Sequence, residues 1–90
     1  MTFEYDEFAD TMWVALSEPM HPCVYTEGET AGVILRIEKI SGIIRGFEIT
    51  AWKRRLAHGL ILIPEISDSN FSVNWIQEQA RIKASIGFQS

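Results

Sequence analysis

Three carboxylates, Asp6, Glu7 and Asp10, lie close together at the start of the chain, just before it becomes apolar. Hard cations are held by several such oxygens at about 2.0–2.6 Å, but the stretch lacks the Asp-x-Asp-x-Asp-Gly spacing of a calcium loop. A turn between two strands uses the same residues, because an Asp side chain accepts hydrogen bonds from the backbone that follows it. We therefore interpret Asp6 as the cap of a turn in which the small Ala9 tucks underneath. No metal or cofactor is expected.

A second group with potential chemistry is the His-x-Cys pair formed by His21 and Cys23, since zinc accepts both ligand types. A structural zinc site needs four ligands, whereas the chain offers one further histidine, His58, and no second cysteine. A nucleophilic Cys23 would need a base and an orienting third group, and His21 is poorly placed for that role. Phosphate-binding, dinucleotide-binding, serine-hydrolase and zinc-protease motifs are missing from the sequence. We therefore predict no enzyme and interpret the pair as part of a loop.

The basic residues Lys53, Arg54 and Arg55 form a cluster flanked by Trp52 and His58. Basic side chains interleaved with aromatic ones can bind RNA through phosphate pairing and base stacking. Three such charges are few in a chain whose net charge is −4, and they can equally pair with acidic side chains of the protein or of a partner. Weak RNA binding through Trp52 to Arg55 is therefore kept as an alternative, and nucleic acid is not the expected partner.

The composition describes a folded, acidic domain. Ninety residues accommodate one hydrophobic core, and 47% apolar residues are too many for a disordered tail. A lone cysteine, Cys23, suits a reducing compartment, and the acidic N-terminus does not resemble a signal peptide. Because the longest apolar run is far below the roughly 20 residues that cross a bilayer, we expect a cytoplasmic protein without a membrane segment.

Alternation of apolar and polar residues predicts several short strands in the first half of the chain. The clearest pair is GVILRIEK and GIIRGFEITAW, joined by a turn in which Gly42 can adopt positive φ. In the second of these strands the alternation groups Arg45 with Phe47 on one face and places Ile44 on the other. Further strands are expected at residues 3–6, 11–17 and 23–27.

The second half changes period. KRRLAHG is typical of a single helical turn closed by Gly59, and LILIPEI of a short apolar strand. From Ser69 onward apolar residues recur at helical spacing, and they exceed what one narrow helix face needs. Such a helix covers the sheet or binds a partner, and both readings stay open. The candidate partner interface consists of Phe71, Trp75, Ile76, Ile82 and Ile86.

These elements predict an α+β fold, a small antiparallel β-meander sheet with a C-terminal α-helix packed on it or on a partner. We expect one domain, 1–90, in which residues 1–58 form the meander core. Residues 59–90 contribute the short apolar strand and the helix.

The opening Tyr5-Asp6-x-x-Ala9-Asp10 and the later Gly-Phe-Glu-Ile strand resemble a small prokaryotic family known as the domain of unknown function 2283. The resemblance covers Phe3 to about Leu56 and implies a small β-rich fold without known catalytic residues. The residues that carry the resemblance at the opening, Tyr5, Asp6, Ala9 and Asp10, are the ones we interpret from their chemistry as a structural turn motif. Some similar proteins are thought to be antitoxins that pair with small basic toxins.

The sequence thus predicts a non-enzymatic protein-binding module, such as an antitoxin-like inhibitor of a small basic toxin. Its acidic surface would steer a basic partner toward it. The main alternative is a homodimeric structural domain that uses the same apolar helix to bind a second copy of the chain.

Overall fold

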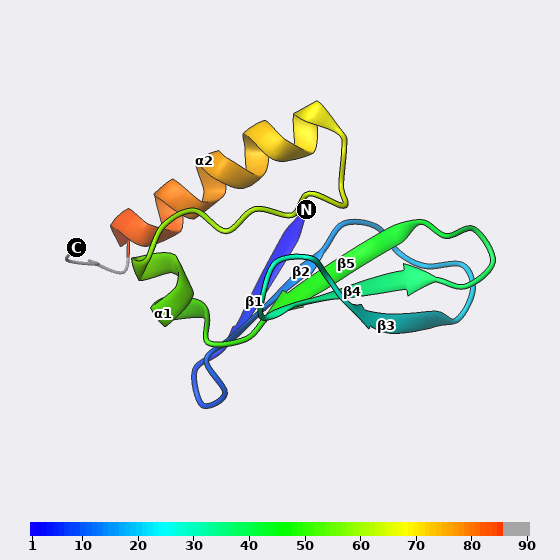
Figure 1. The fold of residues 1–90 in the computed structure, drawn as a ribbon, viewed down its shortest axis with the longest axis horizontal. Helices are drawn as coiled ribbons and strands as arrows, with labels where there is room; N and C mark the ends of the chain where they lie inside the picture. Colours follow the sequence, from blue (N-terminus) through cyan, green and yellow to red (C-terminus); the bar gives the residue numbers. More distant parts are fainter. Residues whose placement is uncertain (86–90) are drawn as a thin grey trace.

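The computed structural model describes residues 1–85 and shows a twisted five-stranded sheet with one long helix lying across it (Figure 1). A short helix follows the last strand, and an extended segment leads from it to the long helix. All strand pairs are antiparallel. The elements are β1 (Thr2–Asp6), β2 (Thr11–Ala15), β3 (Cys23–Glu27), β4 (Val33–Glu38), β5 (Ile44–Ile49), α1 (Trp52–Ala57) and α2 (Ser69–Ser85).

The α+β class predicted from the sequence is confirmed, but the strand order is not that of a simple meander. The order is β1-β2-β5-β4-β3, so β5 lies between β2 and β4 while β3 forms an edge. β5 carries Phe47 and Ile49, which are 3% and 0% exposed. These side chains need apolar neighbours on both sides, and the central position provides them. The connection from β2 to β3 therefore spans the sheet, a route that alternation along the chain does not reveal.

The β4–β5 hairpin forms as predicted, with Gly42 in its turn at φ 72°. A register shift in the ladder changes one predicted face: Arg36 pairs with Gly46, but Ile37 pairs with Ile44. One residue of β5, Arg45, is therefore left unopposed as a β-bulge. As a result Ile44 packs against the core, which corrects the predicted face assignment.

Helix α2 packs against the sheet of its own chain. Trp75 is 1% exposed and its ring contacts those of Phe3, Phe47, Phe71 and Trp52, with centroids 5.3 to 6.3 Å apart. Aromatic pairs at these separations add to the stability that the buried apolar area provides. The sequence left open whether the helix packs in cis or in trans, and the structure shows cis packing.

The apolar segment before α2 is not a strand, contrary to the prediction. Its backbone is held by helix side chains: the Ile61 N–H donates to Gln79 Oε1 at 2.8 Å, and Trp75 Nε1 donates to the Ile61 carbonyl at 2.7 Å. Ile61 and Ile63 point into the core. The predicted helical turn is confirmed as α1, and Gly59 follows it at φ 140°.

Candidate functional site

The acidic corner between β1 and β2 is a hydrogen-bonded turn. Asp6 Oδ1 accepts from the N–H groups of Phe8 and Ala9 at 3.0 and 3.2 Å. Tyr5 donates its hydroxyl proton to Asp10 Oδ1 at 2.7 Å. Desolvation and this hydrogen bond to a carboxylate raise the pKa of Tyr5 to about 12. These contacts use the carboxylates to fix the backbone.

Asp10 also joins the corner to α1. Its backbone lies in the left-handed region at φ 49°, and its carbonyl accepts from the N–H of Trp52 at 2.9 Å. Its side chain accepts from the N–H of Lys53 at 3.1 Å, which satisfies one of the unpaired donors at the start of α1. Within residues 1–85, no three His, Cys, Asp or Glu side chains gather closely enough to hold a metal ion.

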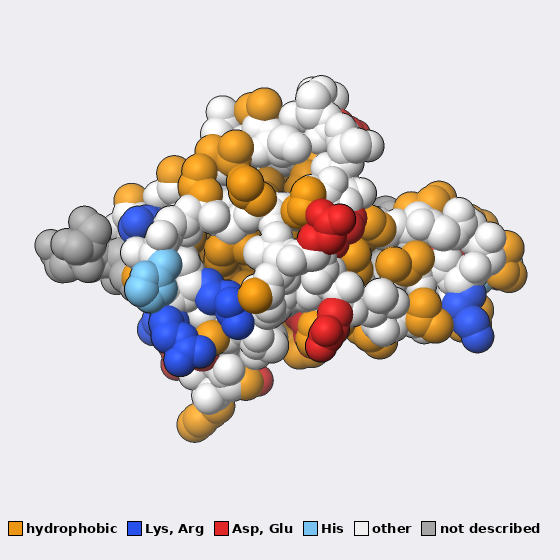
Figure 2. All heavy atoms as spheres, viewed as in Figure 1, with side chains coloured by type: hydrophobic (Ala, Val, Ile, Leu, Met, Phe, Trp, Pro, Cys, Tyr) orange, Lys and Arg blue, Asp and Glu red, His pale blue; other side chains and the backbone are white. Residues whose placement is uncertain are grey.

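The basic cluster lies over α1, where Figure 2 shows the Lys and Arg side chains beside a histidine. Trp52 is 1% exposed and is not available to stack on a base. Lys53 lies 5.7 Å from the centre of the Tyr5 ring, and Arg55 donates to the Thr50 carbonyl at 2.8 Å. Two of the side chains proposed to bind RNA thus make contacts within the protein, and the aromatic one is buried.

The predicted partner interface on α2 separates into groups. Trp75 belongs to the core. The prediction that it anchors a partner is therefore wrong, because its ring is already covered by the sheet. Phe71 and Ile82 are partly buried against the same core. Ile76 is 41% exposed and stays available to a partner, while Ile86 lies outside the described residues.

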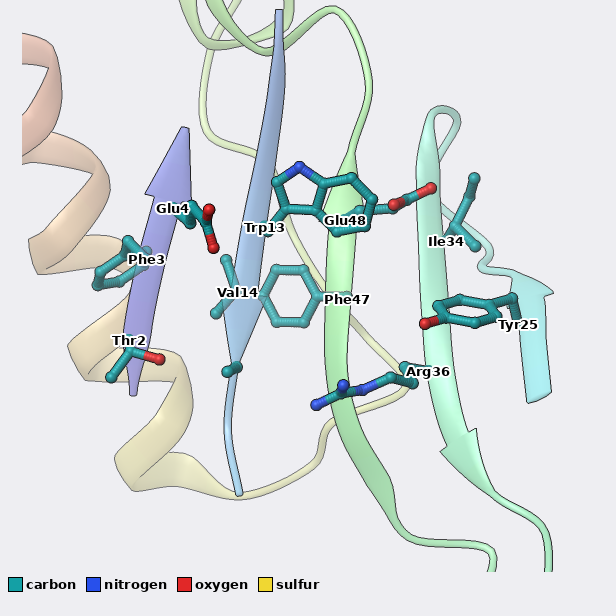
Figure 3. A pocket seen from close by; sticks show the side chains of 11 residues that line it. Thr2, Phe3, Glu4, Trp13, Val14, Tyr25, Ile34, Arg36, Phe47 and Glu48 are labelled. Atoms are coloured by element: carbon teal, nitrogen blue, oxygen red, sulfur yellow. The ribbon is translucent and has the colours of Figure 1, made fainter. Parts of the chain in front are cut away.

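The face of the sheet that points away from α2 contains a hollow that the sequence does not predict. We call this face the open face. It carries two cross-strand rows of residues defined by the ladder pairing. The first row is Glu4, Trp13, Glu48, Ile34 and Glu27, and the second is Thr2, Ala15, Gly46, Arg36 and Tyr25. All of them except Glu27 and Gly46 line a hollow of about 490 Å³ (Figure 3).

The first row places an aromatic ring between two acids. Trp13 is 45% exposed, and the ladder sets Glu4 on one side of it and Glu48 on the other. Directly opposed residues have Cβ atoms about 4.5–5.5 Å apart, so both carboxylates are within reach of a group resting on the indole. Figure 3 shows Glu4 directed toward Trp13, and the Trp13 ring lying next to Glu48. A cation is the ligand that this arrangement fits best, because aromatic faces and carboxylates both attract positive charge.

The second row contains Arg36, whose side chain crosses β5 at Gly46 (Figure 3). Its Nε is buried and has no hydrogen-bond partner within the described chain. Gly46 has no side chain at the point where Arg36 crosses β5. A Cβ there would lie 2.5 Å from the Val14 carbonyl oxygen and 3.5 Å from Arg36 Nη2. Tyr25, 63% exposed, projects from β3 on the other side of Arg36.

A separate ion pair stabilises the far end of the sheet. Arg45, which the bulge leaves without an opposed residue on β4, lies with Nε 3.1 Å from Glu38 Oε2. Glu38 also accepts from the Ser41 hydroxyl at 2.8 Å and from the Met20 N–H at 2.9 Å. The hydrogen bonds from Arg45 and Ser41 lower the pKa of Glu38 to about 2. This cluster fixes the β4–β5 turn and the β2–β3 connection.

Alternation along the strands contained part of the signal for the open face. It separates Ile34 and Arg36 from the core residues of β4, but it does not say which strand lies beside β4. The hollow appears only when β5 is placed between β2 and β4, because that order brings Trp13 and Arg36 onto neighbouring rows.

No family model, curated protein or solved structure matches the chain. The resemblance of the opening motif to the domain of unknown function 2283 therefore stays a prediction. Among residues 1–85, no helix has the length and apolar character needed to cross a membrane.

Proposed function

We propose that this protein is a non-enzymatic protein-binding module, and that its binding surface is the open face of the sheet. The observation that supports this most directly is the half-exposed Trp13 between Glu4 and Glu48. A solvent-facing tryptophan in a hollow is typical of an interface anchor, since aromatic residues dominate the binding energy of protein interfaces. A purely structural role explains the position of this ring less well, because the core lies on the other face of the sheet.

The chemistry of the first row selects a basic partner. A Lys or Arg side chain resting on the indole gains a cation–π interaction and pairs with the flanking carboxylates. The net charge of −4 adds long-range attraction that speeds encounter with a basic protein. An antitoxin-like inhibitor of a small basic toxin is one specific form of this function. The same carboxylates disfavour a nucleic-acid backbone on this face.

The test is to isolate proteins bound by the tagged wild-type chain in its source cells and to measure the affinity of each purified candidate directly. Trp13→Ala is expected to weaken the authentic complex about tenfold or more, as truncation of an interface anchor does. The matched control is Ile76→Ala, a similarly exposed apolar residue on α2. Loss of binding in Ile76→Ala but not in Trp13→Ala would move the interface to the helix and refute the proposal.

Self-association is a second candidate, supported by a different surface. Apolar side chains that are 41% to 57% exposed gather over α2 and the segment before it, where Figure 2 shows several together. They are Leu60, Leu62, Val73 and Ile76. Sedimentation at low and high concentration tests this alternative, because a homodimer dissociates on dilution and a monomer does not change.

A further inference from the structure

We propose that Arg36 is a carboxylate-binding subsite, so that the open face recognises an extended segment of its partner with a basic and an acidic side chain two positions apart. This inference rests on the proposed function and specifies the chemistry of the partner. It assigns the basic side chain to Trp13 and the acidic side chain, an Asp or a Glu, to Arg36.

The unpaired state of Arg36 is the first argument. The other two partly buried arginines of the sheet and α1 are satisfied inside the protein: Arg45 pairs with Glu38, and Arg55 donates to a backbone carbonyl. Arg36 has a buried Nε without a partner, and within residues 1–85 it forms no salt bridge. A desolvated donor that lacks an acceptor costs free energy, which an incoming carboxylate would recover. The guanidinium fork also matches a carboxylate in shape.

The spacing of the two rows is the second argument. Glu48 and Gly46 are two positions apart on β5, and they mark the rows of Trp13 and of Arg36. Two positions along a strand correspond to about 6.4–6.8 Å. A partner segment that runs extended along β5 presents every second side chain to the sheet at the same interval. Figure 3 shows the Trp13 ring and the Arg36 guanidinium at opposite ends of the hollow, as this arrangement requires.

Charge determines which side chain of the partner binds at Trp13 and which binds at Arg36. Glu4 and Glu48 repel a carboxylate placed on Trp13, and Arg36 repels a cation placed on the second row. A segment with the two charges exchanged could bind only by reversing its direction along β5. The open face therefore selects the presence and spacing of two opposite charges.

The experiment uses the full chain and acetylated, amidated pentapeptides at millimolar concentration. The probe is Thr-Arg-Thr-Glu-Thr, compared with versions in which Glu is replaced by Gln, or Arg by Gln, and with one in which Arg and Glu are adjacent. Binding is followed by NMR through the Trp13 indole N–H and the Arg36 Nε–H. Signals from Trp52 and Trp75, both buried, serve as internal references for the fold.

We expect the Glu-to-Gln peptide to bind about tenfold more weakly, the effect of a charged hydrogen bond. In Arg36→Gln the two peptides should bind equally, whereas Arg36→Lys should retain part of the preference. Equal affinity for the two peptides in the wild-type chain, or the same preference in Arg36→Gln, overturns the Arg36 subsite. The adjacent-charge peptide should bind as weakly as the Glu-to-Gln peptide, and tighter binding overturns the two-position spacing.

The same titrations separate this inference from the proposed function. If the Trp13 signal shifts with every Arg-containing peptide but is insensitive to Glu, only the Arg36 subsite fails. If no peptide shifts either signal, the basic-partner chemistry of the open face fails with it. The spectrum of Arg36→Gln without peptide shows whether the variant keeps its fold.

Discussion

Gln79 should be more important for stability than its polarity suggests. Its side chain is 0% exposed and makes a two-way bridge to one backbone unit: Oε1 accepts from the Ile61 N–H at 2.8 Å, and Nε2 donates to the Ile61 carbonyl at 3.0 Å. In Gln79→Leu the carbonyl keeps its hydrogen bond from Trp75, but the buried N–H loses its acceptor. An unsatisfied buried donor costs about 1–3 kcal/mol, and loss of the second hydrogen bond adds about 1 kcal/mol.

The expected loss is therefore about 2–4 kcal/mol, out of the roughly 5–13 kcal/mol typical of a domain of this size. Urea denaturation followed by circular dichroism measures it, and the melting temperature should fall by at least about 8 °C. Gln77→Leu is the matched control, because Gln77 lies on the exposed side of the same helix. If both variants are equally stable within about 0.5 kcal/mol, the segment before α2 is not held by Gln79 and the reasoning is wrong.

Three further predictions concern the corner, the ion pair and the close approach of Gly46 to β2. Because the pKa of Tyr5 is raised to about 12, its contribution to stability is complete below pH 10 and is lost as the pH rises toward 12; thermal unfolding across this range should show a decline that Tyr5→Phe reduces. The pKa of Glu38 is lowered to about 2, so its contribution is complete above about pH 4.5 and is lost as the pH falls toward 2; acid unfolding of Glu38→Gln should show a shallower decline, and an unchanged profile would contradict the role of the Arg45 pair. Gly46→Ala should lower the free energy of unfolding, measured by urea denaturation, by about 1–3 kcal/mol, because its Cβ would meet a β2 carbonyl oxygen at 2.5 Å. If the variant is as stable as the wild-type chain, β2 and β5 can move apart at this point without cost.

The sequence was sufficient for features that depend on near neighbours. The hairpin around Gly42 and the turn capped by Asp6 follow from alternation and from turn chemistry over a few residues. Helix α2 follows from a change of period. Each of these signals is contained within the segment that it describes.

Features that depend on distant neighbours could not be obtained in the same way. The position of β5 is decided by how Phe47 and Ile49 are best covered, which involves β2, β4 and α2 together. The bulge at Arg45 is stabilised by Glu38 and therefore needs the paired strands. Trp75 is predicted at a partner interface because the sequence shows that the helix has more apolar residues than one narrow face needs. The sequence does not show that the sheet of the same chain covers Trp75. The open face was missed because its residues come from all five strands.

The contact between Trp75 and Phe3 joins β1, the first element of the described residues, to α2, the last of them. During synthesis on the ribosome, β1 and the other strands emerge well before the residues that cover their apolar side. The apolar face of the sheet stays exposed until α2 has emerged from the ribosome. This domain therefore completes its folding only after nearly all of the described chain has left the exit tunnel.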